Sequence, residues 1–140
     1  MPELSLNVSR QINAPIEAVF NAWLSPEIMA RFMTPGEGIT VEDAKADPVE
    51  GGVFSLNMIA GENKLPHGGE YKVIKPHSTI VFSWDSPFSV DGTLVTLNFT
   101  AQDGGTLVAL NHVKFADEKT RDNHKGGWSK VLESLEKAVS

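Results

Sequence analysis

Residues 95–112, VTLNFTAQDGGTLVALNH, predict two antiparallel strands joined by a hairpin turn. Val95, Leu97 and Phe99 alternate with polar residues, and the apolar face continues beyond the turn in Val108. A period of two is typical of a strand with one buried face, and the Asp-Gly-Gly sequence between the two runs is a hairpin signal. A sheet of such strands needs an apolar cover on one face.

The alternation of apolar and polar residues also occurs in several segments that precede residue 95. Further strands are expected at residues 4–12, 39–46, 54–58, 71–74 and 80–84. About six strands therefore lie between residues 39 and 114, and their short connections predict antiparallel neighbours. Residues 61–66 are expected to form a loop, and Gly68-Gly69 is interpreted as a turn.

Two short helices are expected between the first strand and the rest of the sheet. Pro15 and Pro26 suit the first turn of a helix, where the missing N–H is not needed. Ser25 can cap the second of these helices. The helices carry the apolar residues Ile16, Val19, Phe20, Trp23, Ile28, Met29, Phe32 and Met33.

The C-terminal segment predicts a longer amphipathic helix. Its apolar stripe consists of Trp128, Val131, Leu132, Leu135 and Val139. Asp117-Glu118 could begin this helix, but Gly126-Gly127 inside it would cost about 2 kcal/mol relative to two alanines. Either the regular helix starts near Asn123, or the glycines permit a close approach or a kink.

These elements together predict an α+β fold in one domain over residues 1–140. A curved antiparallel sheet wraps around the long C-terminal helix, and two short helices follow the first strand. The final helix is the one apolar surface long enough to cover the sheet. Because a single helix cannot fill the whole space inside a curled sheet, a pocket is expected between the sheet, the final helix and the two short helices.

Composition excludes several classes of partner. The 140 residues carry a net charge of -6, which disfavours nucleic acid and anionic membranes. No apolar stretch approaches the roughly 20 residues of a membrane span. Met1-Pro2-Glu3-Leu4 lacks the features of a secretion signal, and there is no cysteine, so a cytoplasmic location is expected.

The sequence does not indicate a metal site, a cofactor or a catalytic constellation. The four histidines, His67, His77, His112 and His124, show neither the spacing of a zinc helix nor a His-x-His strand. No nucleophile elbow and no phosphate-binding loop is present. The protein is therefore expected not to be an enzyme.

Several short motifs resemble one known family along nearly the whole chain. They are Ala14-Pro15, Val19-Phe20, Ala22-Trp23, Pro26-Glu27, Gly51-Gly52, His67 to Tyr71, Ile80 to Trp84, Gly105 to His112, and Gly127-Trp128. In this order they resemble the homologues of the activator of heat shock protein 90 ATPase, within the START-like (SRPBCC) helix-grip superfamily. The resemblance implies a helix-grip fold, an internal ligand pocket and a link to the stress response. The family usually has tryptophan where Phe32-Met33 stand here, so ligand identity does not transfer.

The first functional expectation is a binding domain for a hydrophobic small molecule or lipid. Its predicted lining is Phe32, Met33, Met58, Tyr71, His112 and Trp128. Tyr71 is preferred as pocket lining and Trp84 as core. His112 is either a core-edge histidine satisfied by a neighbour or a polar anchor inside the cavity, and Trp128 either anchors the helix or floors the pocket.

Two other functions stay open at this stage. The resemblance implies a possible chaperone-interacting, co-chaperone-like module, although the related eukaryotic activators carry an additional N-terminal domain for which 140 residues leave no room. A cyclase-like enzyme that shapes its substrate is the second alternative, because the superfamily includes such enzymes. The sequence does not predict the oligomeric state.

Overall fold

The alternating pattern folds into one continuous sheet that carries a long helix. The computed structural model describes residues 4–34, 36, 38–86 and 92–139. The elements are β1 (Ser5–Ile12), α1 (Ile16–Ala22), α2 (Pro26–Phe32), β2 (Ile39–Ala46), β3 (Val53–Ala60), β4 (Asn63–Lys75), β5 (Thr79–Ser83), β6 (Leu94–Gln102), β7 (Gly105–Val113) and α3 (Glu118–Val139). Residues 1–3, to which the expectation about a secretion signal refers, lie outside the described residues.

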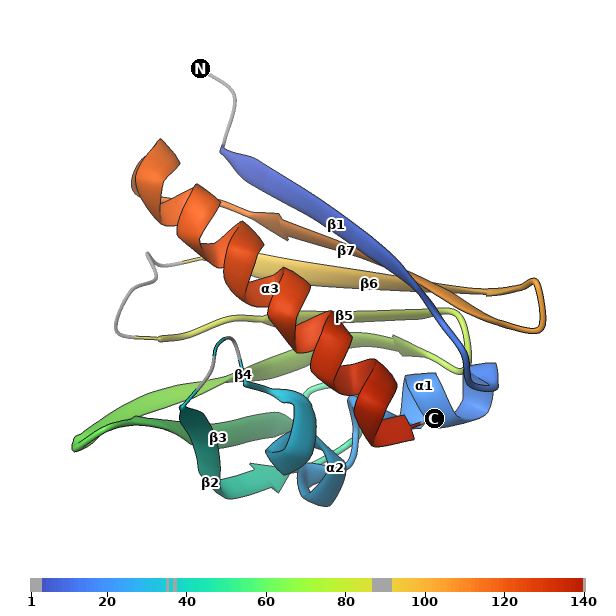
Figure 1. Cartoon of the computed structure of the whole chain (residues 1–140), viewed down its shortest axis with the longest axis horizontal. Coiled ribbons are helices and arrows are strands. Elements are labelled where there is room, and N and C mark those ends of the chain that lie inside the picture. Colours follow the sequence, from blue (N-terminus) through green and yellow to red (C-terminus); the bar gives the residue numbers. More distant parts are fainter. Residues whose placement is uncertain (1–3, 35, 37, 87–91, 140) are drawn as a thin grey trace.

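The seven strands are antiparallel and follow the order β1-β7-β6-β5-β4-β3-β2. Chain neighbours are sheet neighbours from β2 to β7, and β1 adds to the far side of β7. The long helix α3 lies across one face of the sheet, and α1 and α2 lie near its C-terminal end (Figure 1). The predicted α+β helix-grip fold is confirmed.

Side chains directly before α2 and α3 explain where these helices begin. The Ser25 hydroxyl accepts a hydrogen bond from the Ile28 backbone N–H at 3.4 Å, and Pro26 occupies the first helical position. The Asp117 carboxylate accepts one from the Thr120 N–H at 2.8 Å, which lowers the pKa of Asp117. Capping of this kind satisfies backbone donors that have no partner within the helix.

The helix α3 begins at Glu118 and continues through both glycines. Of the two alternatives that the sequence left open, a start near Asn123 is therefore wrong. Gly126 is exposed, and a Cβ atom there would meet nothing within 4 Å. The unfavourable propensity of the pair is offset by the burial of Trp128, Val131, Leu132 and Leu135, which pack on the sheet.

The strand β4 also runs further than the sequence predicted, because residues 63–66 and Gly68-Gly69 belong to it. The expectation of a loop and a turn there is wrong. A Cβ atom on Gly69 would overlap the Ser83 carbonyl oxygen, and one on Gly68 would lie 2.8 Å from the Phe54 carbonyl oxygen. The glycines therefore permit β3, β4 and the end of β5 to approach closely, and His67 lies on the strand directly before them.

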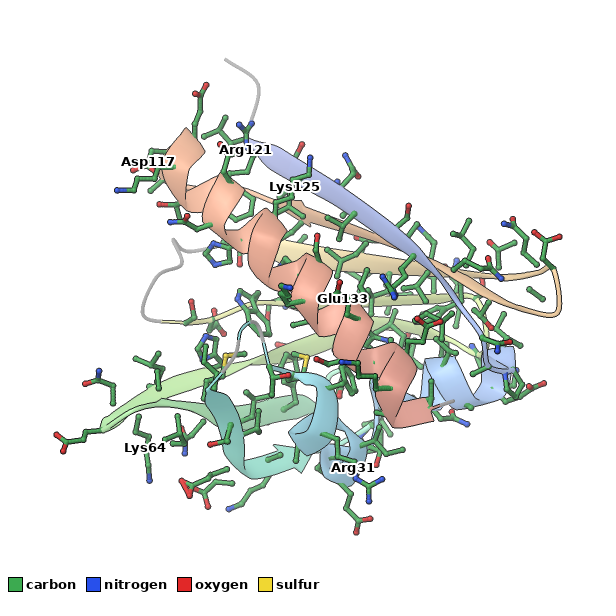
Figure 2. The ribbon with its side chains drawn as sticks, in the orientation of Figure 1. Arg31, Lys64, Asp117, Arg121, Lys125 and Glu133 are labelled. Atoms are coloured by element: carbon green, nitrogen blue, oxygen red, sulfur yellow. The ribbon has the colours of Figure 1, made fainter. Side chains whose placement is uncertain are left out.

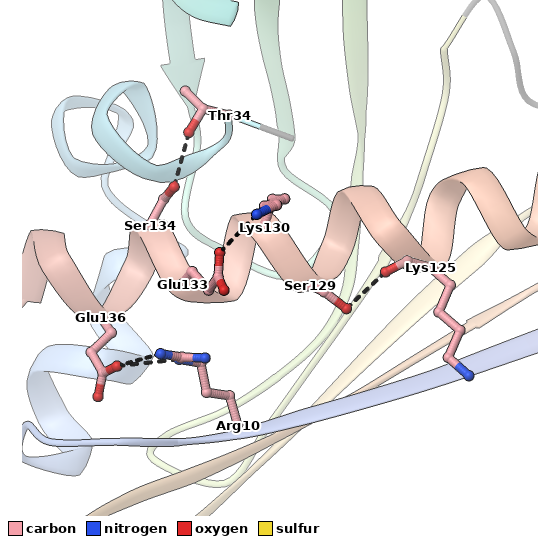
Figure 3. A network of polar contacts seen from close by, with 8 residues as sticks. All are labelled: Arg10, Thr34, Lys125, Ser129, Lys130, Glu133, Ser134 and Glu136. Atoms are coloured by element: carbon pink, nitrogen blue, oxygen red, sulfur yellow. Dashed lines mark hydrogen bonds and ion pairs between the residues drawn. The ribbon is translucent and has the colours of Figure 1, made fainter. Parts of the chain in front are cut away.

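Polar contacts attach α3 to the first strand and to α2. The Arg10 guanidinium donates to the Glu136 carboxylate at 2.8 Å, and the Asn13 N–H donates to its other oxygen at 3.1 Å. The Thr34 and Ser134 hydroxyls lie 3.1 Å apart (Figure 3). These contacts hold the C-terminal half of the helix close to α1 and α2. Within the described residues, no helix has the length and apolarity needed to cross a membrane.

Candidate functional site

A cavity of about 460 Å³ lies between the first half of α3 and the strands β2 to β4. Its lining consists of Ile39, Met58, Leu65, His67, Trp84, Thr120, Asn123, His124, Gly127, Trp128 and Val131. The helical members follow one stripe of α3. The charged side chains of Lys125 and Glu133, labelled in Figure 2, belong to other stripes of the same helix. The cavity is thus formed where α3 does not fill the curl of the sheet.

Aromatic rings form one wall of this cavity. The rings of Trp84 and Trp128 have centroids 4.9 Å apart and planes inclined by 58°, and the His67 ring lies 5.3 Å from Trp84. Trp84 follows β5 and Trp128 lies on α3, so the pair joins the sheet to the helix. Both indoles are at least 95% buried.

Two histidines line the cavity from different elements, His67 on β4 and His124 on α3. The Nδ1 of His67 lies 2.9 Å from the Leu65 carbonyl oxygen, and the Nδ1 of His124 lies 2.8 Å from the Thr120 carbonyl oxygen. Because a carbonyl oxygen can only accept, both Nδ1 atoms donate and, in the neutral rings, both Nε2 atoms carry the lone pair. Neither Nε2 has a hydrogen-bond partner in the described part of the chain.

Behind the aromatic wall, Trp128 Nε1 donates to His112 Nδ1 at 3.0 Å. His112 is fully buried, and burial, with a smaller contribution from nearby His124, lowers its pKa to about 3. The ring is therefore neutral with its proton on Nε2, and this N–H has no partner among the described residues. The hydrogen bond fixes the Trp128 indole so that its ring, and not its N–H, contributes to the cavity wall.

The arrangement of the sheet and the helices agrees with what comparisons with known proteins show. The family model described as "Activator of Hsp90 ATPase homolog 1-like protein" matches residues 13–140. The chain belongs to this family. The family is part of the START-like (SRPBCC) superfamily, so the resemblance seen in the sequence is confirmed.

Solved structures of similar proteins share the fold of this AHSA1-like chain. A protein from Chromobacterium violaceum is 24% identical with a TM-score of 0.86, and the match covers 97% of each chain. An AHSA1-like protein from Aeromonas hydrophila is 25% identical with a TM-score of 0.82, covering 97% of this chain and 92% of that one. A protein from Nitrosomonas europaea is 20% identical with a TM-score of 0.80, covering 96% and 93%. No curated protein matches the chain.

The cavity of this AHSA1-like domain includes two of the six residues predicted from the sequence. Met58 and Trp128 line it. Trp128 also anchors α3 on the sheet. The two interpretations of this residue, as an anchor of the helix and as a floor of the pocket, therefore both apply. Whether either residue contacts a ligand stays a prediction.

The other four predicted residues lie elsewhere. Phe32 is fully buried with its ring 4.9 Å from Trp23, and Tyr71 donates its hydroxyl to the Trp23 carbonyl oxygen at 2.9 Å. Met33 and Tyr71 border a void of about 10 Å³, which is at the lower limit for one water molecule. His112 is a core histidine whose Nδ1 accepts from Trp128, while its Nε2–H has no partner among the described residues, and the structure does not place it on the wall of the large cavity. Phe32, Met33 and Tyr71 fill the interior around α1 and α2, whereas His112 lies beside Trp128 and His124.

Sequence reasoning missed the other nine lining positions, which are Ile39, Leu65, His67, Trp84, Thr120, Asn123, His124, Gly127 and Val131. His67 was placed in a loop because the following glycines suggested a turn. Trp84 belongs to the buried core, as predicted, but it also lines the cavity, whereas Tyr71, which was preferred as lining, does not. The spacing of His124, Gly127, Trp128 and Val131 along one helical stripe was the signal that could have identified the cavity wall.

No group of three or more histidine, aspartate or glutamate side chains in the described ranges could hold a metal ion.

Proposed function

We propose that this domain binds an apolar small molecule or lipid in the cavity between α3 and strands β2 to β4. The observation that supports the proposal is the cavity itself. Its volume of about 460 Å³ lies in the range of small-molecule sites, and its lining is mostly aliphatic and aromatic with a few polar atoms. A polar minority of this kind orients a ligand, whereas the apolar majority supplies the binding free energy.

The adjacent glycines of α3 offer a matched test of the proposed site. Gly127 lines the cavity, and Gly126 is exposed with open space around it. Replacing either by leucine raises helix propensity by a similar amount. Only Gly127→Leu adds a large side chain to the cavity wall.

We expect the parent protein to enhance the fluorescence of the apolar probe N-phenyl-1-naphthylamine. Gly126→Leu should bind this probe as the parent does, and Gly127→Leu should bind it at least tenfold more weakly. Equal binding by both variants would place the probe elsewhere. Failure of the parent to bind the probe, together with an absence of co-purified small molecules in native mass spectrometry, would contradict the proposal.

A second candidate function follows from the family description, which refers to an activator of the Hsp90 ATPase. In this alternative the domain contacts a chaperone. Its test is the ATPase rate of the cognate chaperone with micromolar protein, where a severalfold stimulation would favour the co-chaperone function over ligand binding. If the Gly127→Leu variant still stimulates the ATPase, the co-chaperone function does not depend on the cavity.

We also propose that binding occurs without turnover. The cyclase-like alternative is tested by incubating the protein with whatever compound co-purifies and following that compound by mass spectrometry. Conversion at a rate that depends on protein concentration would make the domain an enzyme.

A further inference from the structure

Two of the four polar side chains that line the cavity, His67 and His124, act as hydrogen-bond acceptors, whereas Thr120 and Asn123 can also donate. His67 and His124 each use Nδ1–H on a backbone carbonyl oxygen, at 2.9 Å and 2.8 Å, and each therefore presents an Nε2 lone pair. The two rings come from different elements, β4 and α3, that both line the same cavity. A ligand in this cavity meets two hydrogen-bond acceptors.

From this geometry we infer that the cavity selects a flat aromatic ligand carrying a hydroxyl or N–H group, whose proton is accepted by Nε2 of His67 or His124. The inference rests on the proposed function and narrows it to a class of ligand. A ligand of the same shape with only acceptor oxygens, such as an ether, would leave both lone pairs unsatisfied. Selection of this kind arises because burying an unpaired polar group is costly.

The acceptor role requires that the histidines are neutral. Burial lowers the pKa of His67, and the nearby His124 lowers it further, although the hydrogen bond to Leu65 acts in the opposite direction. His67 therefore keeps its Nε2 lone pair at neutral pH. The backbone hydrogen bonds fix the same tautomer in both rings, so no rearrangement is needed when a ligand donor arrives.

The preference for an aromatic ligand follows from the rings around the two histidines. Trp84 and Trp128 lie 4.9 Å apart on one wall, and the His67 ring lies 5.3 Å from Trp84. The Trp128 N–H is used on His112, so Trp128 offers its ring. Aromatic rings contact one another favourably in tilted and offset arrangements, beyond the gain from burial alone.

The test compares 2-naphthol with 2-methoxynaphthalene, which have the same ring system but differ in the ability to donate. By isothermal titration at pH 7.5 we expect the parent to bind 2-naphthol about fivefold more tightly, which is the factor that one neutral hydrogen bond supplies. His67→Phe and His124→Phe should each reduce this preference, and the double variant should abolish it. His77→Asn, in the turn between β4 and β5 and not part of the cavity lining, is the control and should keep the preference.

Nitrogen NMR of the parent provides a readout that does not depend on folding of the variants. Accepting a hydrogen bond moves the imidazole Nε2 resonance of His67 or His124, so 2-naphthol should shift it and 2-methoxynaphthalene should not. Equal affinities for the two compounds, or a preference that survives in a folded double variant, would overturn the inference while the proposed function stands. Failure of both compounds and of N-phenyl-1-naphthylamine to bind the parent would overturn both.

Discussion

At the scale of single residues, His112 and Trp128 show how a polar pair supports the wall of the cavity. The Trp128 N–H donates to His112 Nδ1 at 3.0 Å, and both side chains are buried. Buried polar atoms stabilise a fold when they are paired, and a pair of this kind fixes the orientation of a ring. The indole of Trp128 is therefore positioned before any ligand arrives.

This buried pair predicts a loss of stability in acid. The folded protein holds the pKa of His112 at about 3, well below the ordinary value of 6.5, because burial disfavours the charged ring. Between these values the unfolded chain binds one more proton than the folded protein. The free energy of unfolding should therefore fall as the pH falls from about 6.5 toward 3, by up to about 1.4 kcal/mol per pH unit from this residue.

The measurement is urea unfolding of the parent and of His112→Asn at several pH values. Asparagine does not titrate and can still accept from Trp128, so its variant should show a shallower dependence on pH. The lowered pKa values of His67, Asp117 and Glu136 also cause a loss of stability in acid, and both proteins share these contributions. Identical slopes for the two proteins would mean that His112 does not titrate in this range.

At the scale of elements, periodicity predicted most of the fold. The strand β2 has the bounds 39–46 expected from the sequence, and the hairpin of β6 and β7 forms at the predicted turn. The glycine pair 68–69 was wrongly predicted as a turn and lies within β4, and the pair 126–127, for which the sequence left two alternatives open, lies within α3. Local helix and strand propensities predict that such a pair interrupts an element. Tertiary packing retains the pair inside the element, because a close backbone approach requires glycine or because buried neighbouring side chains offset its cost.

The packing of α3 on the sheet predicts the effect of truncating its apolar stripe. Leu132 is 1% exposed and belongs to the central cluster of buried residues. Leu132→Ala should reduce the free energy of unfolding by about 2–5 kcal/mol, since it removes buried methyl groups and leaves a cavity. Urea unfolding measures this loss. The exposed neighbour gives the control, because Lys130→Ala should change stability by less than about 0.5 kcal/mol. A similar small effect at Leu132 would mean that the helix is not packed as described.

At the scale of the whole molecule, the site was harder to predict than the fold. Sequence reasoning expected a pocket between the sheet, the final helix and the two short helices, and so placed it near Phe32, Met33 and Tyr71. These residues instead fill the interior at the C-terminal end of α3, and the cavity lies at the other end. Its place depends on where β2 to β4 diverge from the helix, which no local pattern specifies. Met58 and Trp128 were found because their side chains point inward wherever the opening lies.

The position of the cavity predicts how a bound ligand would stabilise the molecule, if the proposed function holds. The lining joins the first half of α3 to β3 and β4, which are distant in sequence. A ligand there should oppose local separation of these elements more than opening of the β1-β7 pair. With saturating N-phenyl-1-naphthylamine, we expect the largest gain in hydrogen-exchange protection at residues 118–131 and 55–67. Gly127→Leu should show no gain with the same probe. Protection that rises mainly around α1 and α2 would place the ligand at the opposite end of the helix, against the packed aromatic side chains, and would contradict the assignment of the site.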